Sequence, residues 1–411
     1  MEKEKIKKRK PFGLWAKRVL VVFIITLVLG VVFDLGYATG IRGANLGATL
    51  PIERIINKDS DKPAEVDFAV FWESWNKLNS SYFGKVDAKT LIQGAISGML
   101  SATGDPYTMY LKPEDNQRFL DDISGEFNGI GVEINQIDGI PTVVAPLPDS
   151  PAAKAGLKAK DVILEVDEES TLDMNFDEVI NKIRGQEGTE VVLTILRAGQ
   201  RESQKITIKR ERIKVASVST DVKNYQGKSF YYIKVRQFGD DTSSLFEKAS
   251  DEINNGNYSG VILDLRNDPG GYLDTAVDLA SYFIEDRVVV TEIDRNGSKK
   301  ESKTTRKATL KDKKLVVIIN EGSASASEIL AGAMQDYTRA TVIGQKSFGK
   351  GSIQILEELS DKGAVKITIA KWQTPNGSQI DGVGIEPDVI IENKDAMDEE
   401  YINKALEILS K

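Results

Sequence analysis

Three loops of this chain contain residues that could carry out chemistry, and each follows an apolar, strand-like run. They span residues 264–271, 321–328 and 344–351. Loops at the ends of strands are where α/β proteins usually hold their functional groups. The residue types in each loop therefore indicate what chemistry it could support.

The first loop contains the turn Pro269-Gly270-Gly271. Glycines allow a sharp turn whose backbone N–H groups can point outward at the start of a helix. Donors arranged in this way suit an oxyanion. An ordinary strand-to-helix turn has the same composition, so this segment alone leaves both interpretations open.

The second loop carries three alternating serines, Ser323, Ser325 and Ser327, before a run with one buried helical face. A serine at a strand-to-helix junction exposes its hydroxyl, and the helix dipole favours the negative charge that develops during its attack. Serine is also a preferred helix N-cap. The residues alone therefore do not decide which serine, if any, is a nucleophile.

The third loop, GQKSFGKG, nearly matches the phosphate-binding pattern G-x-x-x-x-G-K-[ST]. Gly351 stands where that pattern needs a hydroxyl, and the continuation SIQILEEL is typical of a strand rather than a helix. We therefore reject nucleotide binding at this loop. Lys350, between two glycines, is either a surface residue or a residue with another function.

The composition restricts the catalytic base. The chain has no His and no Cys, which excludes a Ser-His-Asp triad, a Cys nucleophile and thiolate metal sites. A serine nucleophile would need Lys, Asp, Glu, Tyr or a metal as its base. A free lysine has a pKa of about 10.4, but burial can lower this by several units. Lys350 could then accept the proton, with Gln354 aiming the amine without raising its pKa.

Five motifs, FWESWNKL, GDPYTMYL, DLRNDPGG, NEGSASASE and FGKGSIQ, together resemble the carboxyl-terminal processing peptidases, the tail-specific serine protease family. The likeness runs from about residue 66 to 392. It implies that Ser325 is the nucleophile, Lys350 the general base and Gln354 the residue that orients it. It also implies that the backbone N–H groups of Gly271 and Ala326 hold the oxyanion, and that no metal or cofactor is needed.

One residue departs from the family pattern. Asp268 stands where a small or amide residue is more usual, which leaves the detail of that loop open. The main alternative function is a catalytically inactive PDZ scaffold that binds protein C-termini, and the intact Ser325, Lys350 and Gln354 argue against it. A metal-dependent hydrolase is a weaker alternative.

The elements that must position these loops form an α/β core over residues 209–392, followed by a C-terminal helix over 393–411. Strand-like runs alternate with helical runs at 243–255, 272–283 and 327–337. This alternation indicates a βαβ-type arrangement. The predicted fold class is a multidomain α/β protein whose serine protease core contains a mixed sheet.

A PDZ domain is predicted as an insertion at residues 120–208, because short strands and two short helices follow one another in the PDZ order. Its carboxylate-binding loop would be Gly129-Ile130-Gly131-Val132. The N–H groups of that loop would bind the terminal carboxylate of a peptide, and the adjacent strand edge would accept the peptide. Arg197 could sense this carboxylate or brace the domain against the protease core; otherwise it is a solvated hairpin residue.

Residues 65–119 are predicted to form a helical N-terminal domain. Phe68, Phe71, Trp72 and Trp75 repeat at helical spacing, which is typical of one apolar face. This face would pack in the core of the domain or against a second copy in a homodimer.

The N-terminus predicts a membrane anchor. A basic, cytoplasmic segment over 1–18 precedes an uncharged apolar run at 19–33, which extends to 41 with one Asp and forms a transmembrane signal anchor. The basic flank places the body on the extracytoplasmic side of a bacterial cell membrane. Residues 42–64 would be a linker. A cleaved signal peptide is the alternative.

The charge distribution bears on partners. The net charge is −8, and the first 18 residues carry eight Lys or Arg and two Glu, which leaves −14 on the remainder. An acidic body argues against nucleic acid as a partner. The expected partners are unfolded or C-terminally exposed protein substrates, together with the membrane.

Overall fold

The computed structural model describes residues 66–137, 139–392 and 398–411. The predicted basic segment at 1–18, the anchor at 19–41 and the linker at 42–64 lie outside the described residues. Within the described residues, no helix is both long and apolar enough to cross a bilayer.

The chain divides into two compact units, of which the first ends at Ile92. Its helix α2 (Ala69–Ser81) carries the predicted aromatic face. The rings of Phe71, Trp72 and Trp75 lie 5.0–6.2 Å apart between centroids. No residue of α2 is buried. The aromatic side chains therefore pack on one another along the helix, and homodimer formation through this face stays a prediction.

The second unit, from Gln93 onward, contains a six-stranded sheet with the order β10-β11-β12-β15-β16-β19. β10 pairs antiparallel with β11, and all other pairs are parallel. The central runs VILD and LVVII are buried along their whole length, as expected for strands covered on both faces. The strands are β10 (Val218–Tyr225), β11 (Lys228–Val235), β12 (Val261–Asp264), β15 (Leu315–Ile319), β16 (Thr341–Gly344) and β19 (Val389–Ile390).

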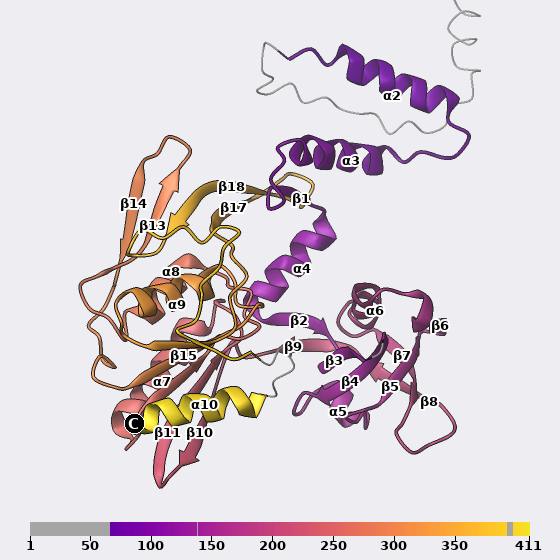
Figure 1. Ribbon diagram of the computed structural model, residues 1–411. Helices are drawn as coiled ribbons and strands as arrows, with labels where there is room; N and C mark the ends of the chain where they lie inside the picture. Colours follow the sequence, from indigo (N-terminus) through magenta and orange to yellow (C-terminus); the bar gives the residue numbers. More distant parts are fainter. Residues whose placement is uncertain (1–65, 138, 393–397) are drawn as a thin grey trace, which may run out of the picture. The chain divides into compact units, whose positions relative to one another are not determined.

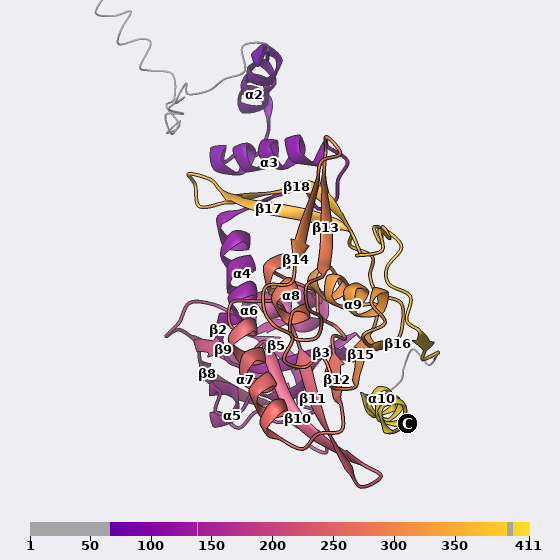
Figure 2. The same ribbon diagram turned by 90° about the vertical axis from the view of Figure 1, so that its left-hand side faces the viewer.

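Helices cover both faces of this sheet. Val317 and Ile319 pack with apolar residues of α7 (Thr242–Asn255), α8 (Leu273–Ala280) and α9 (Ala326–Asp336). The alternate residues Val316 and Ile318 pack against α10 (Asp398–Ser410). Figure 2 separates α7 and α10 on opposite sides of the strands. The two-residue period of a strand thus divides the core into two layers.

A second, antiparallel sheet was only partly predicted. It joins β1 (Met109–Leu111), β13 (Val288–Asp294), β14 (Lys299–Lys303), β17 (Ser352–Glu358) and β18 (Ala364–Gln373). Only β17 was expected from the sequence. β1 interrupts the segment predicted to be entirely helical, between α3 (Ala88–Ser101) and α4 (Pro113–Ser124), because its residues pair with β18. The segment before the PDZ domain therefore contributes a strand to the core.

The insertion has the element order predicted for a PDZ domain. Its sheet has the order β3-β4-β5-β7-β8, with β6 beside β5, around a separate apolar core (Figure 1). The insertion is flanked by a pair of strands, β2 (Glu126–Gly129) and β9 (Glu211–Lys214). The other elements are β3 (Val132–Ile137), β4 (Ile140–Pro146), α5 (Pro151–Lys154), β5 (Val162–Val166), β6 (Glu169–Ser170), a 3-10 turn (Thr171–Asp173), α6 (Phe176–Ile183), β7 (Glu190–Leu196) and β8 (Gln204–Lys209).

Candidate active site

The three loops singled out in the sequence line one cavity of about 810 Å³. Ser325, Lys350 and Gln354 all line it, together with Gly270 and Gly271. The first two loops follow the neighbouring parallel strands β12 and β15, so their ends meet at the same edge of the sheet. The structure therefore brings together residues that are up to 84 positions apart.

The structure distinguishes the three serines. Ser323 and Ser327 are fully buried, and their hydroxyls donate to the backbone oxygens of Leu265 (2.7 Å) and Asp268 (2.8 Å). Ser325 is half-buried and is the only one of the three in the part of the chain described here that lines the cavity. Its backbone has φ 55° and ψ −113° at the junction between the loop and α9. Strained backbone at such a junction is a common feature of functional turns.

Glu328 connects the serine loop to the lysine loop. Its carboxylate is fully buried and accepts hydrogen bonds from the N–H of Ser325 (2.8 Å) and the N–H of Lys350 (2.9 Å). It also accepts from the N–H of Gly349 (2.7 Å) and the hydroxyl of Ser347 (2.6 Å). One buried carboxylate thus satisfies four donors and fixes the two loops relative to each other.

Lys350 has the properties that a lysine base requires. Burial and, to a lesser extent, the positive charge of Lys366 lower its pKa, the carboxylate of Glu328 opposes both effects, and the resulting pKa is about 8. The Nζ atom lies 5.2 Å from the centre of the Tyr107 ring. With this pKa, roughly a tenth of the amine is unprotonated at pH 7, far more than in an exposed lysine.

Gln354 lies on β17 where its register with β18 shifts. Its Nε2 donates to the hydroxyls of Ser352 (2.9 Å) and Thr368 (3.2 Å). Both amide hydrogens are thereby engaged. The amide oxygen of Gln354 can still accept a hydrogen bond. Lys350, a possible donor, lines the same cavity.

The Pro-Gly-Gly turn requires its glycines. A Cβ on Gly270 (φ 98°) would lie 2.8 Å from the Cβ of Ser325, and one on Gly271 (φ 144°) would lie 2.2 Å from the backbone oxygen of Phe238. The turn is fixed by Phe238, which donates its N–H to Gly270 (2.9 Å) and accepts from Tyr272 (2.8 Å). Among the described residues, no acceptor bonds the N–H of Gly271 or Ala326. These two donors remain available to a ligand.

Asp268, the departure from the family pattern, is accommodated as a buried residue. Its Oδ1 accepts the N–H of Gly270 at 2.8 Å, whereas Oδ2 has no partner in the described parts of the chain. Burial raises the pKa of Asp268 well above its ordinary value, although the Gly270 hydrogen bond opposes this. Burial therefore favours the neutral form of this carboxyl, which supports the turn through its bond to Gly270.

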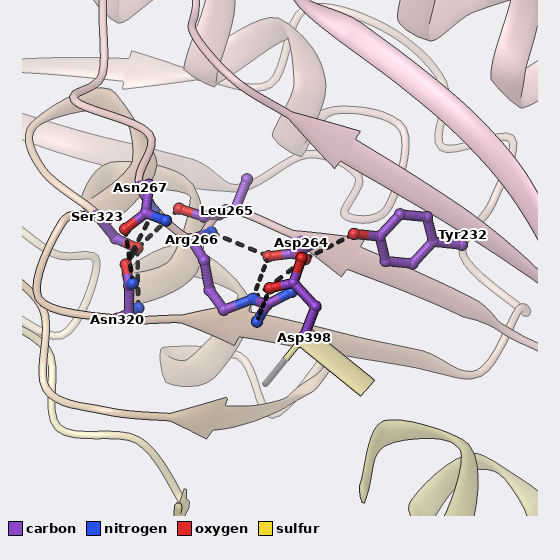
Figure 3. A network of polar contacts seen from close by, with 8 residues as sticks. All are labelled: Tyr232, Asp264, Leu265, Arg266, Asn267, Asn320, Ser323 and Asp398. Atoms are coloured by element: carbon purple, nitrogen blue, oxygen red, sulfur yellow. Dashed lines mark hydrogen bonds and ion pairs between the residues drawn. The ribbon is translucent and has the colours of Figure 1, made fainter. Parts of the chain in front are cut away.

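A polar network holds the base of the first two loops (Figure 3). The guanidinium of Arg266 is buried and bonds Asp264 through Nε and Nη2 and Asp398 of α10 at 2.9 Å. The hydroxyl of Tyr232 donates to Asp264 (2.7 Å). Asn320 donates from its side chain to that of Asn267 (2.8 Å), which joins the two loops directly.

The predicted carboxylate-binding loop lines a second, smaller cavity of about 230 Å³. Gly129, Ile130, Gly131 and Val132 form one side of it. A Cβ on Gly131 (φ 68°) would lie 2.6 Å from the Cβ of Ser150, so the loop needs a glycine there. The position beside the edge of β3 matches a groove for an extended peptide.

Arg197 is not brought to this groove. Its guanidinium pairs with the buried Asp161 at 2.7 Å and donates to the backbone oxygen of Gly156 at 2.9 Å. Arg197 is not among the residues that line the cavity. Its partners Asp161 and Gly156 both belong to the PDZ domain, so these contacts neither reach the peptide carboxylate site nor brace the domain against the core.

Comparison with known proteins identifies the family. The model described as peptidase family S41 matches residues 229–391, a PDZ domain model matches 142–197, and the activating protease CtpB N-terminal domain matches 47–115. A probable CtpA-like serine protease of Staphylococcus haemolyticus is 35% identical over 386 residues, which cover 93% of this chain and 74% of the relative. The chain belongs to this family of CtpA-like serine proteases. The resemblance to carboxyl-terminal processing peptidases is confirmed.

Other relatives of this S41 chain agree. A probable CtpA-like serine protease of Staphylococcus epidermidis is 40% identical over 77% of the chain, which spans 64% of that relative's length. The photosystem II D1 C-terminal processing protease is 28% identical with a TM-score of 0.52, over 82% of this chain and 92% of that one. A putative S41 protease from Bacteroides fragilis, 15% identical with a TM-score of 0.54, covers 80% of this chain and 91% of that one and supports the fold alone.

Two residues of this S41 chain line both cavities. Phe127 and Arg184 border the peptide groove and the larger cavity. The guanidinium of Arg184 lies 4.7 Å from the centre of the Phe127 ring and pairs with Asp122 of α4 at 3.1 Å. The Phe127 ring and the Arg184 guanidinium thus form a boundary that the two cavities share.

Sequence reasoning missed Glu328, Arg184 and Lys366 as parts of the site. For Glu328 a signal was present, because S-x-x-E before an apolar run is the pattern of a capping box. For Lys366 and Arg184 there was none. Both lie in ordinary alternating or helical runs and reach the cavity only through tertiary packing.

Proposed function

We propose that this chain is a serine endopeptidase with a Ser325/Lys350 dyad that processes or degrades proteins recognised by their C-termini. One observation carries the proposal. In a chain without histidine, a half-buried lysine whose pKa is lowered to about 8 lines the same cavity as the serine at the strained start of α9. The shared tie through Glu328 supports this pairing.

In the proposed reaction, Ser325 Oγ attacks the peptide carbonyl carbon while its proton passes to the neutral Nζ of Lys350. The oxyanion of the tetrahedral intermediate accepts hydrogen bonds from the N–H groups of Gly271 and Ala326. When the C–N bond breaks, the Lys350 ammonium gives its proton to the leaving amine. Lys350 then takes a proton from a water molecule as the water oxygen attacks the acyl-enzyme. When the ester bond breaks, Lys350 returns this proton to Ser325 Oγ.

The PDZ groove is proposed to select substrates by a free C-terminus at Gly129–Val132, with unfolded or C-terminally exposed proteins as the substrate class. We place the body outside a bacterial cell membrane, anchored by residues 19–41, with homodimer formation through the N-terminal helices. The basic flank and the apolar run support the anchor, and the exposed aromatic face of α2 supports the dimer.

The deciding experiment is degradation of an unfolded protein by the purified full-length chain and by Ser325→Ala. We expect cleavage by the first, none by the second, and no effect of EDTA on the first. If the wild-type chain binds free C-terminal peptides but cleaves nothing, the alternative of an inactive PDZ scaffold holds. If EDTA abolishes cleavage, a metal-dependent mechanism replaces the dyad.

A further inference from the structure

A second lysine in the larger cavity takes no part in the proposed proton transfers. Lys366 lies on β18 and lines the same cavity as Ser325 and Lys350. In the strand register it stands between Met109 of β1 and Leu356 of β17, so its backbone is held from both sides. Its side chain is half-buried, and its charge acts on Lys350. The sheet therefore fixes a cation at the wall of the cavity.

The ammonium of Lys366 lacks an anionic partner. Its Nζ lies 5.0 Å from the centre of the Phe119 ring, which lines the cavity as well. Within residues 66–137, 139–392 and 398–411, no carboxylate pairs with this ammonium and no oxygen accepts a hydrogen bond from it. A ring face attracts the charge but supplies none of the oxygen acceptors that the three N–H donors of an ammonium need. Burial lowers the pKa of Lys366, as expected for a cation that loses water without gaining an anion.

The other charged residues of the cavity wall do not neutralise Lys366. The acidic residues of the described lining, Asp121 and Asp122, each bond another side chain. Arg236 also lines the cavity and bonds only the hydroxyl of Ser219 among the described side chains, but it is exposed. An ion pair gains more where solvent is partly excluded. Lys366 is therefore the stronger site for an incoming anion.

We propose that Lys366 binds an acidic side chain, Asp or Glu, of the peptide substrate, close to the bond that is cleaved. The inference rests on the proposed function in one respect, because that function places a protein chain in this cavity. It also assigns the C-terminal carboxylate of the substrate to the loop Gly129–Val132, so the carboxylate that reaches Lys366 comes from a side chain. The charge-assisted pair satisfies the ammonium and selects substrate sequences that carry an acidic residue.

The surroundings of Lys366 strengthen this selection. Phe119, which contacts the ammonium, and Leu356, its neighbour across the strands, are apolar residues of the same lining. A substrate glutamine in this position would displace water from the ammonium and supply no negative charge in return. We therefore expect glutamate and glutamine, which have nearly the same shape, to be clearly distinguished.

Binding to the full-length Ser325→Ala variant tests the proposal without turnover. The probes are octapeptides of alanine and leucine, N-terminally acetylated and C-terminally amidated, so that the PDZ groove has no terminal carboxylate to bind. One set carries a single Glu at each position in turn, and the matched set carries Gln. By calorimetry at pH 7, we expect at least one Glu peptide to bind about 10-fold or more tightly than its Gln counterpart. Equal affinities at every position overturn the proposal.

Replacements in the Ser325→Ala background test whether Lys366 is the residue that binds. Lys366→Met removes the charge, so the preference for Glu should fall to within about twofold. Lys366→Gln repeats the test if thermal unfolding shows that the methionine variant is not folded. Lys371→Met, on the same strand but exposed and paired with Asp381, and Arg236→Gln should both keep the preference. A preference that survives the loss of the Lys366 charge, or that disappears in Arg236→Gln, overturns the assignment.

Cleavage of an unfolded protein by the wild-type chain, measured in parallel, separates this inference from the proposed function. If the wild-type chain cleaves and no Glu peptide is preferred, the peptidase stands and the binding role of Lys366 is wrong. If Glu peptides bind through Lys366 while the wild-type chain cleaves nothing, the carboxylate site stands and the peptidase is wrong.

Discussion

At the scale of single residues, the proposed dyad relies on Lys350 as its base, because the chain has no histidine. Its amine is prepared by burial and by the nearby charge of Lys366, not by an ion-pair partner. Arginine and lysine can both carry a positive charge, but of the two only lysine can also supply a neutral, basic amine. This distinction gives two predictions.

Replacing Lys350 by Arg should be as damaging as replacing Ser325 by Ala, with kcat lowered by at least about 100-fold. Arginine keeps the charge but cannot lose its proton in the working range of pH. The measurement is steady-state turnover of a peptide substrate, with thermal unfolding to show that the variant is folded. Turnover within about threefold of wild type would exclude Lys350 as the base.

The activity should rise with pH through the lowered pKa of Lys350, near 8, because only the unprotonated amine can accept the Ser325 proton. Lys366→Met removes a positive charge that lowers this pKa, so the rising limb of kcat/KM should move to higher pH. Lys371→Met, on the same strand but exposed and paired with Asp381, should leave the limb in place. A limb that stays fixed in Lys366→Met would show that Lys366 does not tune the base.

At the scale of elements, the site depends on one carboxylate that joins α9 to the turn before β17. Glu328 accepts three N–H groups and one hydroxyl from the two loops that carry Ser325 and Lys350. A helix and a loop that would otherwise move separately are therefore held as one unit. Loss of this acceptor should affect stability and catalysis together.

In Glu328→Gln, an amide NH₂ group replaces one carboxylate oxygen. This group is itself a donor, so it cannot accept hydrogen bonds from the N–H and O–H groups that face it. We expect the free energy of unfolding to fall by about 2 kcal/mol or more, with kcat reduced. Urea denaturation followed by fluorescence measures the first effect and turnover the second. The exposed Glu321→Gln in the same loop is the control. If both variants match wild type, Glu328 does not hold the loops.

The elements also show how far sequence reasoning reaches. The parallel strands were predictable because VILD and LVVII are continuous apolar runs between helical segments. β18 was not, since its first half shows no alternation of buried and exposed residues and its partner β1 is more than 250 positions earlier. The absence of histidine already pointed to Lys350 and Gln354 beside a serine, but the choice of Ser325 among the three serines followed only from the family resemblance. The four groups that donate hydrogen bonds to Glu328 come from two loops, and no local sequence pattern relates these loops to each other.

At the scale of the whole second unit, the PDZ domain enters and leaves through one pair of strands. Gly129 of β2 pairs directly with Glu211 of β9. Phe127 and Arg184 then lie between its groove and the larger cavity. A peptide terminus in the groove would therefore contact residues that also line the larger cavity, and it could influence the site by favouring one arrangement of this boundary.

We expect the intact protein to cleave a substrate with a free apolar C-terminus at least about 10-fold faster than its C-terminally amidated form. Replacing residues 130–210 by a short turn between β2 and β9 should remove that preference, because the pairing of Gly129 with Glu211 lets a tight hairpin close the gap. Competition kinetics with the two substrates measure the ratio. Equal rates in the intact protein would reduce the PDZ domain to a docking module.

The pairing of β1 with β18 also sets when the proposed site can be complete during synthesis of the chain. Met109 leaves the ribosome 257 residues before its partner Lys366, and Asp398, which binds Arg266, follows later still. At about 5–20 residues per second, this interval lasts between roughly ten seconds and a minute. Throughout it, the nascent chain lacks Lys350, Gln354 or the strand that orients them. The proposed site therefore cannot be complete until synthesis has passed β18.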